Sequence, residues 1–264
     1  MKLISFKTDN TDKVGVLNGN KIVEIKSSME EAIKSSDIVD FEILGSHNFE
    51  DVIINSPILP SKIVCVGLNY TDHAKELDME LPDEPVIFIK PSTAVIGHKN
   101  NIIYPKCSTH VDYEVELGIV ISNEAYQVKS EDAVEHIAGY TVINDVTARD
   151  LQEKDVQWTR AKSFDTFAPI GPCIETELDP MNQNISLWLN SDLKQNSNTK
   201  NMIFNVFELV EFISNIMTLK TGDIISTGTP PGVGSMDIGD VVKAEVEDIG
   251  VLENLMNDSK IKKI

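Results

Sequence analysis

Three acidic residues recur at every second position of one apolar segment. The segment Val111–Leu117 reads Val-Asp-Tyr-Glu-Val-Glu-Leu, so that Asp112, Glu114 and Glu116 alternate with apolar side chains. In a β-strand this period of two places the three carboxylates on one face, with neighbouring residues about 7 Å apart. Like charges at this spacing repel each other unless water, a cation or a basic side chain offsets them. The segment therefore predicts either a half-buried strand with a water-exposed acidic face, or a site of hard oxygen ligands suited to Mg²⁺ or Mn²⁺.

A second group of polar residues follows about thirty positions later. Asp145 interrupts the apolar run 139–146, and an aspartate at the end of a buried strand is unfavourable unless it is paired or binds a metal. Arg149 and Gln152 come next, and they share one face if this segment is helical. Lys162 precedes a passage rich in proline and glycine. These residue types could bind a cation and the oxygen atoms of an anionic ligand.

His73 and Glu76 form the third candidate group. Their spacing of three places both side chains on one face of a short helix that Thr71 or Asp72 could cap. A carboxylate that bonds to an imidazole orients the ring, as a general base requires. The same spacing also arises by chance on surface helices that do no chemistry. Prolines 82 and 85 end the helix, so residues 71–84 are a candidate mobile lid.

Composition limits the classes of partner. The chain has 42 acidic and 23 basic residues and a formal charge of −19, which makes nucleic acids and anionic membranes poor partners. No apolar run approaches the roughly 20 residues of a membrane span, and no signal-peptide core is present. The odd number of cysteines without metal-like spacing favours a reducing compartment, and we expect a cytoplasmic protein. The cysteines are Cys65, Cys107 and Cys173.

The elements that must position these groups are mostly strands. Residues 1–25 predict short strands with a hairpin turn and residues 28–38 a helix, which together indicate a small N-terminal β-rich domain over 1–57. The main domain, 58–264, contains many short strands and one clear amphipathic helix over 203–219. The glycine-rich loop 228–234 lacks the Gly-Lys-Ser/Thr sequence of a phosphate loop. The fold class predicted is mixed β with few helices, an α+β arrangement.

The order of these pieces resembles the fumarylacetoacetate hydrolase family over roughly residues 58–257. Each segment alone is a weak signal, but five in this order are specific to the superfamily. Within it, the chain looks most like acylpyruvase-like or 2-hydroxyhepta-2,4-diene-1,7-dioate isomerase-like members. The matching segments are 67–76 (Gly-Leu-Asn-Tyr-x-x-His-x-x-Glu), 111–117, 144–152 (Asn-Asp-Val-Thr-Ala-Arg-Asp-Leu-Gln), 162–165 (Lys-Ser-Phe-Asp) and 226–234 (Ser-Thr-Gly-Thr-Pro-x-Gly-Val-Gly).

This resemblance implies a β-sandwich roll, a homodimer and a role for each candidate residue. The implied ligands of Mg²⁺ or Mn²⁺ are Glu114, Glu116 and Asp145; the implied catalytic groups are His73, Glu76 and Lys162; the implied substrate-binding groups are Arg149, Gln152 and Thr229. Three of them could instead have structural roles: Arg149 as an ion pair with Asp150 or Asp145, Lys162 as a surface charge, and Thr229 as a turn residue. Some members carry arginine where Leu68 stands, so any anion contact made by that arginine is absent here.

The chemistry that the resemblance implies is the enolisation of a small 2-oxo acid. The leading expectation is metal-dependent hydrolysis of a carbon–carbon bond in a 3-acyl-2-oxo acid, an acylpyruvate or fumarylpyruvate-like substrate, with His73 activating water and Lys162 stabilising the enolate. Oxaloacetate decarboxylation is the runner-up, and isomerisation or hydration of a 2-hydroxymuconate-type compound uses the same core. The sequence is also compatible with a metal-binding protein without catalysis, and with a protein that binds no metal.

Overall fold

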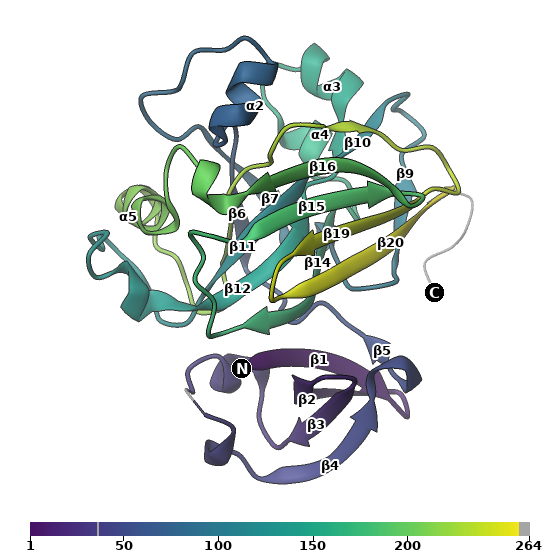
Figure 1. Cartoon of the computed structure of the whole chain (residues 1–264), viewed down its shortest axis with the longest axis vertical. Coiled ribbons are helices and arrows are strands. Elements are labelled where there is room, and N and C mark those ends of the chain that lie inside the picture. Colours follow the sequence, from purple (N-terminus) through teal and green to yellow (C-terminus); the bar gives the residue numbers. More distant parts are fainter. Residues whose placement is uncertain (36, 259–264) are drawn as a thin grey trace.

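The computed structural model describes residues 1–35 and 37–258. Three β-sheets make up most of this part of the chain, together with five short α-helices. Figure 1 shows the N-terminal strands in a small lobe below a larger lobe that holds the other sheets. The predicted mixed β fold with few helices is confirmed.

The largest sheet runs through both lobes. Its main path, in spatial order, is β4 (Ile43–Asn48), β3 (Lys21–Ile25), β2 (Thr11–Asn18), β1 (Lys2–Thr8), β14 (Ala168–Glu175), β12 (Ile137–Asn144), β11 (Val115–Ile121), β17 (Ile224–Ser226), β6 (Lys62–Val66) and β7 (Ile87–Pro91). Two short strands complete it, β5 (Ile53–Ile54) beside β1 and β8 (Val95–Ile96) beside β14. The acidic strand β11 therefore lies inside the sheet, whereas β7 lies at the end of this path.

The two lobes are joined by strand pairing and by packing. β1 pairs with β14 in the register Leu3↔Ile174. Leu3 also belongs to a buried cluster that includes Ile63 and Ile170 of the larger lobe. The predicted boundary at 57/58 falls between β5 and β6, and the division into two domains stays a prediction. Residues 259–264 of the predicted main domain lie outside the described residues.

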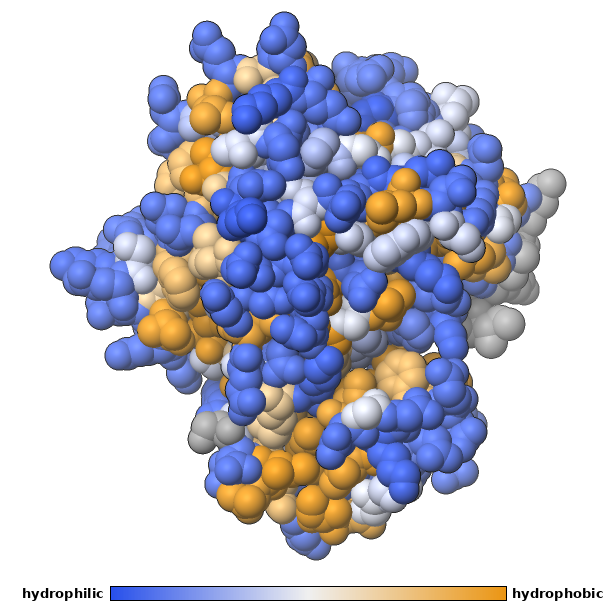
Figure 2. Space-filling view, in the orientation of Figure 1, coloured by the Kyte–Doolittle hydropathy of each residue, from blue (hydrophilic) through white to orange (hydrophobic). Residues whose placement is uncertain are grey.

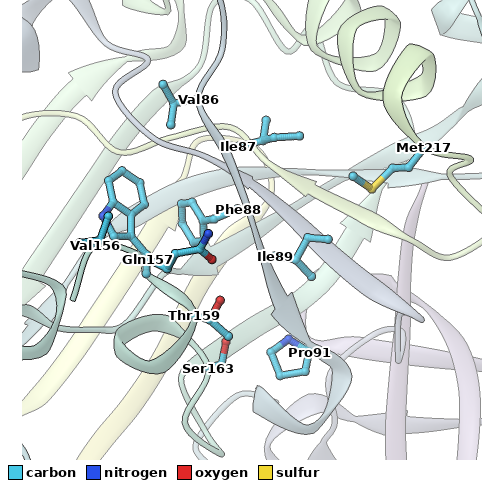
Figure 3. A pocket seen from close by; sticks show the side chains of 11 residues that line it. Val86, Ile87, Phe88, Ile89, Pro91, Val156, Gln157, Thr159, Ser163 and Met217 are labelled. Carbon is cyan, nitrogen blue, oxygen red and sulfur yellow. The ribbon is translucent and has the colours of Figure 1, made fainter.

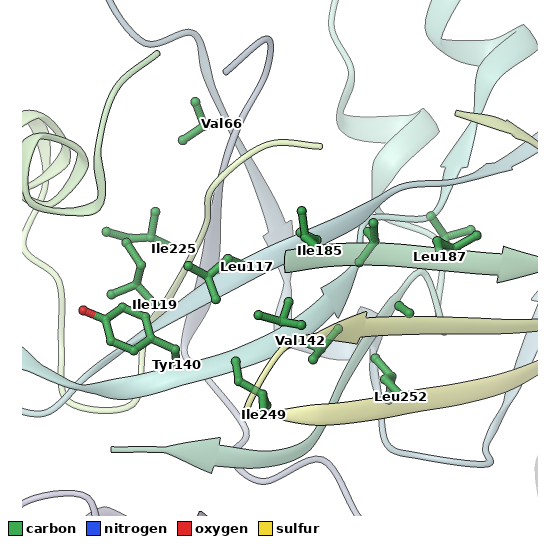
Figure 4. Packing of buried hydrophobic residues seen from close by; sticks show 14 of the residues in the cluster. Val66, Leu117, Ile119, Tyr140, Val142, Ile185, Leu187, Ile225, Ile249 and Leu252 are labelled. Carbon is green, nitrogen blue, oxygen red and sulfur yellow. The ribbon is translucent and has the colours of Figure 1, made fainter. Parts of the chain in front are cut away.

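A five-stranded sheet packs against the larger lobe's part of the first sheet. Its order is β16 (Asp192–Asn198), β15 (Asn184–Leu189), β19 (Val241–Val246), β20 (Gly250–Asp258) and β9 (Asn101–Tyr104). Figure 4 shows Leu117 and Val142 from one sheet near Ile185, Leu187 and Leu252 from the other. All five side chains are buried, so the main hydrophobic core lies between these sheets.

The helices are short and lie around the sheets. They are α1 (Met29–Ala32), α2 (Thr71–Glu76), α3 (Arg149–Lys154), α4 (Thr159–Lys162) and α5 (Val206–Ile216), with 3-10 turns at Ile38–Asp40, Phe49–Asp51, Ser92–Ala94, Ala133–His136 and Thr199–Asn201. The predicted helix over 203–219 is confirmed as α5. It is shorter because the Asn205 side chain caps its start by accepting hydrogen bonds from the amides of Phe207 and Glu208. None of the described helices is long and apolar enough to cross a bilayer.

The acidic segment differs from the predicted continuous strand. It is divided at Glu114 between β10 (Val111–Tyr113) and β11, and β10 belongs to a small third sheet with β13 (Thr147–Ala148) and β18 (Gly234–Ser235). Both faces of the segment are buried, and Asp112 and Glu116 are only 3% and 1% exposed. The expectation of a water-exposed acidic face is therefore wrong. Basic side chains from other elements take the place of water.

The outer surface carries most of the remaining acidic residues. Figure 2 shows hydrophilic side chains over most of the face in view, with hydrophobic side chains gathered over the small lobe. Val39, Ile43 and Leu44 of that lobe are each more than half exposed. Asp112, Glu114, Glu116 and Asp145 thus differ from most acidic residues of the chain, because they lie inside the protein.

Candidate active site

The three predicted metal ligands come together at the ends of two neighbouring strands. Glu114 lies at the break between β10 and β11, Glu116 is on β11, and Asp145 follows the last residue of β12. The Asp145 amide donates a hydrogen bond of 2.8 Å to the Glu114 carbonyl, which brings the two side chains together. Each of the three offers a carboxylate oxygen within 4.8 Å of the others, and all three residues are buried.

Two lysines neutralise part of this charge. Lys162, the last residue of α4, places its Nζ 2.8 Å from Glu114 Oε2 and 2.6 Å from Asp145 Oδ2. Lys90 on β7 donates to Asp145 Oδ1, and to the Val146 carbonyl at 3.0 Å. The interpretation of Lys162 as a surface charge is wrong, since its side chain is only 3% exposed. Sequence reasoning missed Lys90, although a lysine within an apolar strand is itself a signal of a buried partner.

Arg149, the first residue of α3, connects the triad to the remaining acidic residue of the segment. Its Nε donates to Asp112 Oδ2 at 2.7 Å, and its terminal nitrogens donate to Glu114 Oε1 and Gln152 Oε1. His110 Nε2 lies 2.8 Å from the other Asp112 oxygen. Arg149 is thus an ion-pairing residue at the edge of the triad. The predicted common face of Arg149 and Gln152 is confirmed.

The ion-pair partners of Arg149 are not those considered from the sequence. Asp150 instead accepts hydrogen bonds from Ser108 Oγ at 2.6 Å and from the Thr109 amide at 3.0 Å. Asp145 is bound by the two lysines. Neighbouring residues on a helix point in different directions, so Asp150 faces the loop before β10 while Arg149 faces the triad.

The carboxylates of the triad differ in charge state. Burial raises the pKa of Glu114, but Lys162 and Arg149 outweigh this effect and lower its pKa to about 2. Burial, followed by repulsion from Asp145 and Glu114, raises the pKa of Glu116 to about 8. Glu116 Oε2 accepts hydrogen bonds only from neutral donors, the Ser226 hydroxyl at 2.5 Å and the Gly228 amide at 2.9 Å. Glu116 therefore keeps its proton at neutral pH without a cation, and its ionisation would add one negative charge that the basic residues do not compensate.

His73 and Glu76 form the predicted contact on α2. His73 Nδ1 lies 2.8 Å from Glu76 Oε2, and the Gly232 amide donates to Glu76 Oε1 at 3.1 Å. Gly232 has φ +94°, and a Cβ there would lie 2.1 Å from the Lys194 carbonyl oxygen, so only glycine fits this approach. Asp72 further holds the helix by accepting a hydrogen bond of 2.6 Å from Ser197 Oγ. The mobility of the lid over 71–84 stays a prediction.

Thr229 has a structural contact in addition to its place in the site. Its hydroxyl donates to the Val115 carbonyl at 2.9 Å and accepts from Gln195 Nε2 at 2.8 Å. Gln195 is fully buried, and its Oε1 accepts from the Val115 amide at 3.0 Å. Sequence reasoning missed Gln195, because nothing in the local pattern of β16 distinguishes it from its exposed polar neighbours.

All the site residues predicted from the sequence except Glu116 line one cavity of about 550 Å³, which is large enough for a small-molecule ligand. The cavity is charged at its base and apolar elsewhere. Phe88 lies between the two parts, because Lys162 Nζ is 5.0 Å from the centre of its ring and Trp158 packs edge-on against it at 5.4 Å. The lining residues are Val66, Gly67, Leu68, His73, Glu76, Leu77, Met79, Phe88, Glu114, Asp145, Arg149, Gln152, Trp158, Lys162, Thr229 and Val233.

The donor set fits a divalent cation. All three offered ligands are carboxylate oxygens, which Mg²⁺ and Mn²⁺ prefer, and they are already close together. A cation would also remove the repulsion that raises the pKa of Glu116. The buried triad could therefore hold a divalent metal, as the sequence predicts.

Comparison with known proteins agrees with the fold and the site. Residues 62–257 match the model of the fumarylacetoacetate (FAA) hydrolase C-terminal family, and the chain belongs to this family. An uncharacterized protein of Methanocaldococcus jannaschii is 56% identical over 84% of this chain and 100% of that protein. Bovine mitochondrial oxaloacetate tautomerase FAHD2B is 45% identical over 74% of this chain and 66% of that protein. The structure of a 2-hydroxyhepta-2,4-diene-1,7-dioate isomerase from Mycobacterium marinum has a TM-score of 0.89 and 38% identity, covering 99% of this chain and all of that one.

Proposed function

We propose that this chain is a divalent-metal-dependent enzyme that hydrolyses the carbon–carbon bond of a 3-acyl-2-oxo acid of the acylpyruvate type. The observation that carries this proposal is one cavity lined by the His73–Glu76 pair, Lys162 and two members of the carboxylate triad, Glu114 and Asp145. A binding protein without catalysis would have no need of an oriented imidazole facing a metal site. Glu114, Glu116 and Asp145 would hold Mg²⁺ or Mn²⁺, which supplies a positive charge for the oxygens of a 2-oxo acid.

His73 is the group that moves a proton. Its Nδ1 faces the Glu76 carboxylate, which can only accept, so Nδ1 carries the hydrogen and Nε2 keeps its lone pair. Nε2 can therefore take a proton from a water molecule, which adds to the acyl carbonyl. Cleavage then gives a carboxylic acid and pyruvate, with the proton held on His73 returned to the pyruvate carbon. Glu76 keeps the ring in this orientation because the Gly232 amide holds the carboxylate in turn.

Lys162 and Arg149 act on negative charge at the base of the cavity. The Lys162 ammonium is buried among carboxylates and, although burial lowers its pKa, Asp145 and Glu114 outweigh this and raise it, so the lysine stays charged. A fixed cation beside the cavity stabilises the enolate that leaves during cleavage. Arg149 keeps Glu114 in place and, with Gln152, presents hydrogen-bonding groups to substrate oxygens.

A second candidate is the keto–enol interconversion of oxaloacetate. The name of the bovine relative supports it, since that protein is an oxaloacetate tautomerase at 45% identity. The same imidazole could remove a proton from C3 of the substrate and return it to the oxygen or the carbon. Oxaloacetate decarboxylation needs no attacking water, so it depends less on His73.

The rate of acetylpyruvate cleavage by the His73→Ala variant tests the proposal. With saturating Mn²⁺, we expect acetylpyruvate cleavage to fall by about 10²–10⁴-fold, the usual loss for a general base. Glu76→Gln loses less, because the ring remains. His136→Ala is the matched control, since His136 lies outside the cavity. Wild-type acetylpyruvate cleavage in His73→Ala would overturn the hydrolytic role. Absence of acetylpyruvate cleavage in the wild type, together with rapid oxaloacetate tautomerisation, would favour the second candidate.

The homodimer and the cytoplasmic location expected from the sequence stay predictions. Light scattering coupled to size-exclusion chromatography would test the first. A mass near that of one 29.3 kDa chain would contradict it.

A further inference from the structure

We propose that the cavity selects 2-oxo acids with a single carboxylate and an uncharged, apolar group beyond C3, and that it excludes a second carboxylate at that end. This inference rests on the proposed function, which places the 2-oxo acid at the carboxylate triad. It adds the chemical class of the other half of the substrate.

The first argument is the charge at the base of the cavity. Four carboxylates and three basic side chains lie in or next to the triad, so that with Glu116 ionised, as a ligand must be, the balance is one negative charge. A divalent cation changes this balance to one positive charge, which the single carboxylate of a 2-oxo acid neutralises. A substrate with two carboxylates leaves a net negative charge in a buried region, which is unfavourable. The seven residues are Asp112, Glu114, Glu116, Asp145, Lys90, Arg149 and Lys162.

The second argument is that each basic group lining the cavity already has an acidic partner. Lys162 lies between Glu114 and Asp145. All three nitrogens of the Arg149 guanidinium donate hydrogen bonds within the chain. His73 is paired with Glu76. Among the described residues that line the cavity there is no further lysine, arginine or histidine to receive a second carboxylate.

The third argument is the chemistry of the outer part of the cavity. Its wall is formed by Leu68, Leu77, Met79 and Trp158. A hollow of about 690 Å³ shares Phe88 and Trp158 with it and has only uncharged lining residues, as Figure 3 shows. Apolar walls favour an alkyl or aryl group by the area removed from water and provide no partner for a carboxylate.

The acidic residues of the lid would also repel a distal carboxylate of the substrate. The lid, 71–84, carries one lysine, Lys75, next to Glu76, and from there to Lys90 the chain carries no basic residue. It carries four exposed acidic residues there, which are Asp78, Glu80, Asp83 and Glu84. A distal carboxylate near the lid would therefore meet charges of its own sign. Oxaloacetate, which the bovine relative's name gives as its substrate, has two carboxylates. The inference therefore predicts that the two proteins differ in the substrates they select.

A pair of unreactive 2-oxo acids tests the inference by binding alone. 2-Oxoglutarate and 5-methyl-2-oxohexanoate share the chelating end, and an isopropyl group replaces the distal carboxylate in the second. Calorimetric titration of the Mn²⁺-loaded protein should give at least about tenfold tighter binding of 5-methyl-2-oxohexanoate. Equal affinities, or tighter binding of 2-oxoglutarate, would overturn the inference and leave the proposed function in place. Binding of neither compound would overturn the proposed function itself.

A charge introduced at the apolar wall sharpens this test. Leu68→Arg places a cation beside the cavity, and Leu68→Gln is the matched control for the lost apolar side chain. Leu68→Arg should tighten 2-oxoglutarate binding by about tenfold relative to Leu68→Gln, the usual gain from a hydrogen bond to a charged group. Leu68→Arg should not tighten the binding of 5-methyl-2-oxohexanoate. An unchanged ratio of the two affinities, with a melting temperature near that of the wild type, would contradict the inference.

Discussion

Asp223 and the carboxylate triad are buried at neighbouring strands of one sheet, and they differ in how far the chain compensates their negative charge. Asp223 precedes β17 and is fully buried, and its two oxygens accept five hydrogen bonds, from the amides of Ser61, Lys62 and Lys220, the Ser61 hydroxyl and the Lys62 ammonium. Glu116, on the next strand β11, accepts from one hydroxyl and one amide and lies near two other carboxylates.

The pKa values of the two groups move in opposite directions. Burial raises the pKa of Asp223, but the hydrogen bonds from Lys62, Ser61 and Lys220 outweigh it and lower the pKa. Burial and two carboxylates raise the pKa of Glu116 to about 8. A carboxylate such as Asp223, whose charge is compensated by hydrogen bonds within the chain, stabilises the fold. One whose charge the chain leaves uncompensated is suited to bind a cation, at a cost in stability when the cation is absent.

The largest expected effect is on catalysis. Glu116→Gln should reduce the Mn²⁺-dependent rate by more than about 100-fold, since even residues that only support a metal ligand cost 10–100-fold. Glu114→Gln and Asp145→Asn should behave alike. Asp223→Asn is the matched control and should keep its rate per folded molecule. Steady-state assays below the melting temperature check this, and similar losses in Glu116→Gln and Asp223→Asn would remove the distinction between the two groups.

The effects on stability should be in the opposite order, with a larger loss in Asp223→Asn than in Glu116→Gln. Asp223→Asn leaves the partly buried Lys62 ammonium without its partner, so the free energy of unfolding should fall by about 3 kcal/mol. Glu116→Gln in the presence of EDTA should unfold at the same or a higher urea concentration than the wild type. Glutamine is neutral in both states, so folding no longer has to protonate a carboxylate that is ionised in the unfolded chain. Urea titrations measure both. A large loss of stability in Glu116→Gln would mean that Glu116 is also a structural carboxylate.

Metal should stabilise the protein through the triad alone. At a hundredfold excess of Mn²⁺ over its dissociation constant, the free energy of unfolding should rise by about 2.7 kcal/mol. Asp223→Asn should gain the same amount and Glu116→Gln much less. The shift in melting temperature on addition of Mn²⁺ or Mg²⁺ is the readout. An equal shift in Glu116→Gln would place the bound ion elsewhere.

The dependence of stability on pH is the smallest of these effects for a change of one pH unit. Without metal, folded Glu116 keeps a proton up to about pH 8, whereas the unfolded chain loses it near its ordinary value of about 4.3, so stability falls as pH rises between these values. The slope is at most about 1.4 kcal/mol per pH unit and should vanish in Glu116→Gln. Asp223 has a lowered pKa, so its contribution is complete above about pH 4 and is lost at lower pH. Urea titrations in EDTA across this range should show both slopes, and a flat profile between pH 5 and 8 would contradict the assigned charge state of Glu116.

The sequence predicted the parts of the site that are short-range or that repeat a family motif. Alternation made Glu114 and Glu116 visible, and Asp145 stood out because it interrupts an apolar run, but the choice of these three as ligands came from the family resemblance. The His73–Glu76 contact could be predicted because helical spacing fixes it. The sequence did not reveal Lys90 and Gln195, because each contacts a residue dozens of positions away on a strand with which its own strand does not pair, and only the packing of the folded chain brings them together.

The same limit explains the corrections to the fold. The water-exposed face was a reasonable expectation for an alternating strand, but local alternation does not tell whether a strand lies at an edge or inside a sheet. Here β11 lies inside its sheet, with Leu117 packed against the five-stranded sheet on one face and Glu116 only 1% exposed on the other. The division at Glu114 likewise depends on β10 pairing with β13 and β18, which are distant in sequence.

Calorimetric titration with Mn²⁺ tests the central claim most directly, because it needs neither a substrate nor a catalytic rate. The wild type and Asp223→Asn should bind one ion per chain, and at pH 7 binding should release a proton from Glu116, seen as a difference in heat between two buffers of unlike ionisation enthalpy. Glu114→Gln, Glu116→Gln and Asp145→Asn should bind at least about 100-fold more weakly. No binding by the wild type at millimolar Mn²⁺, or undiminished binding by all three variants, would contradict the account.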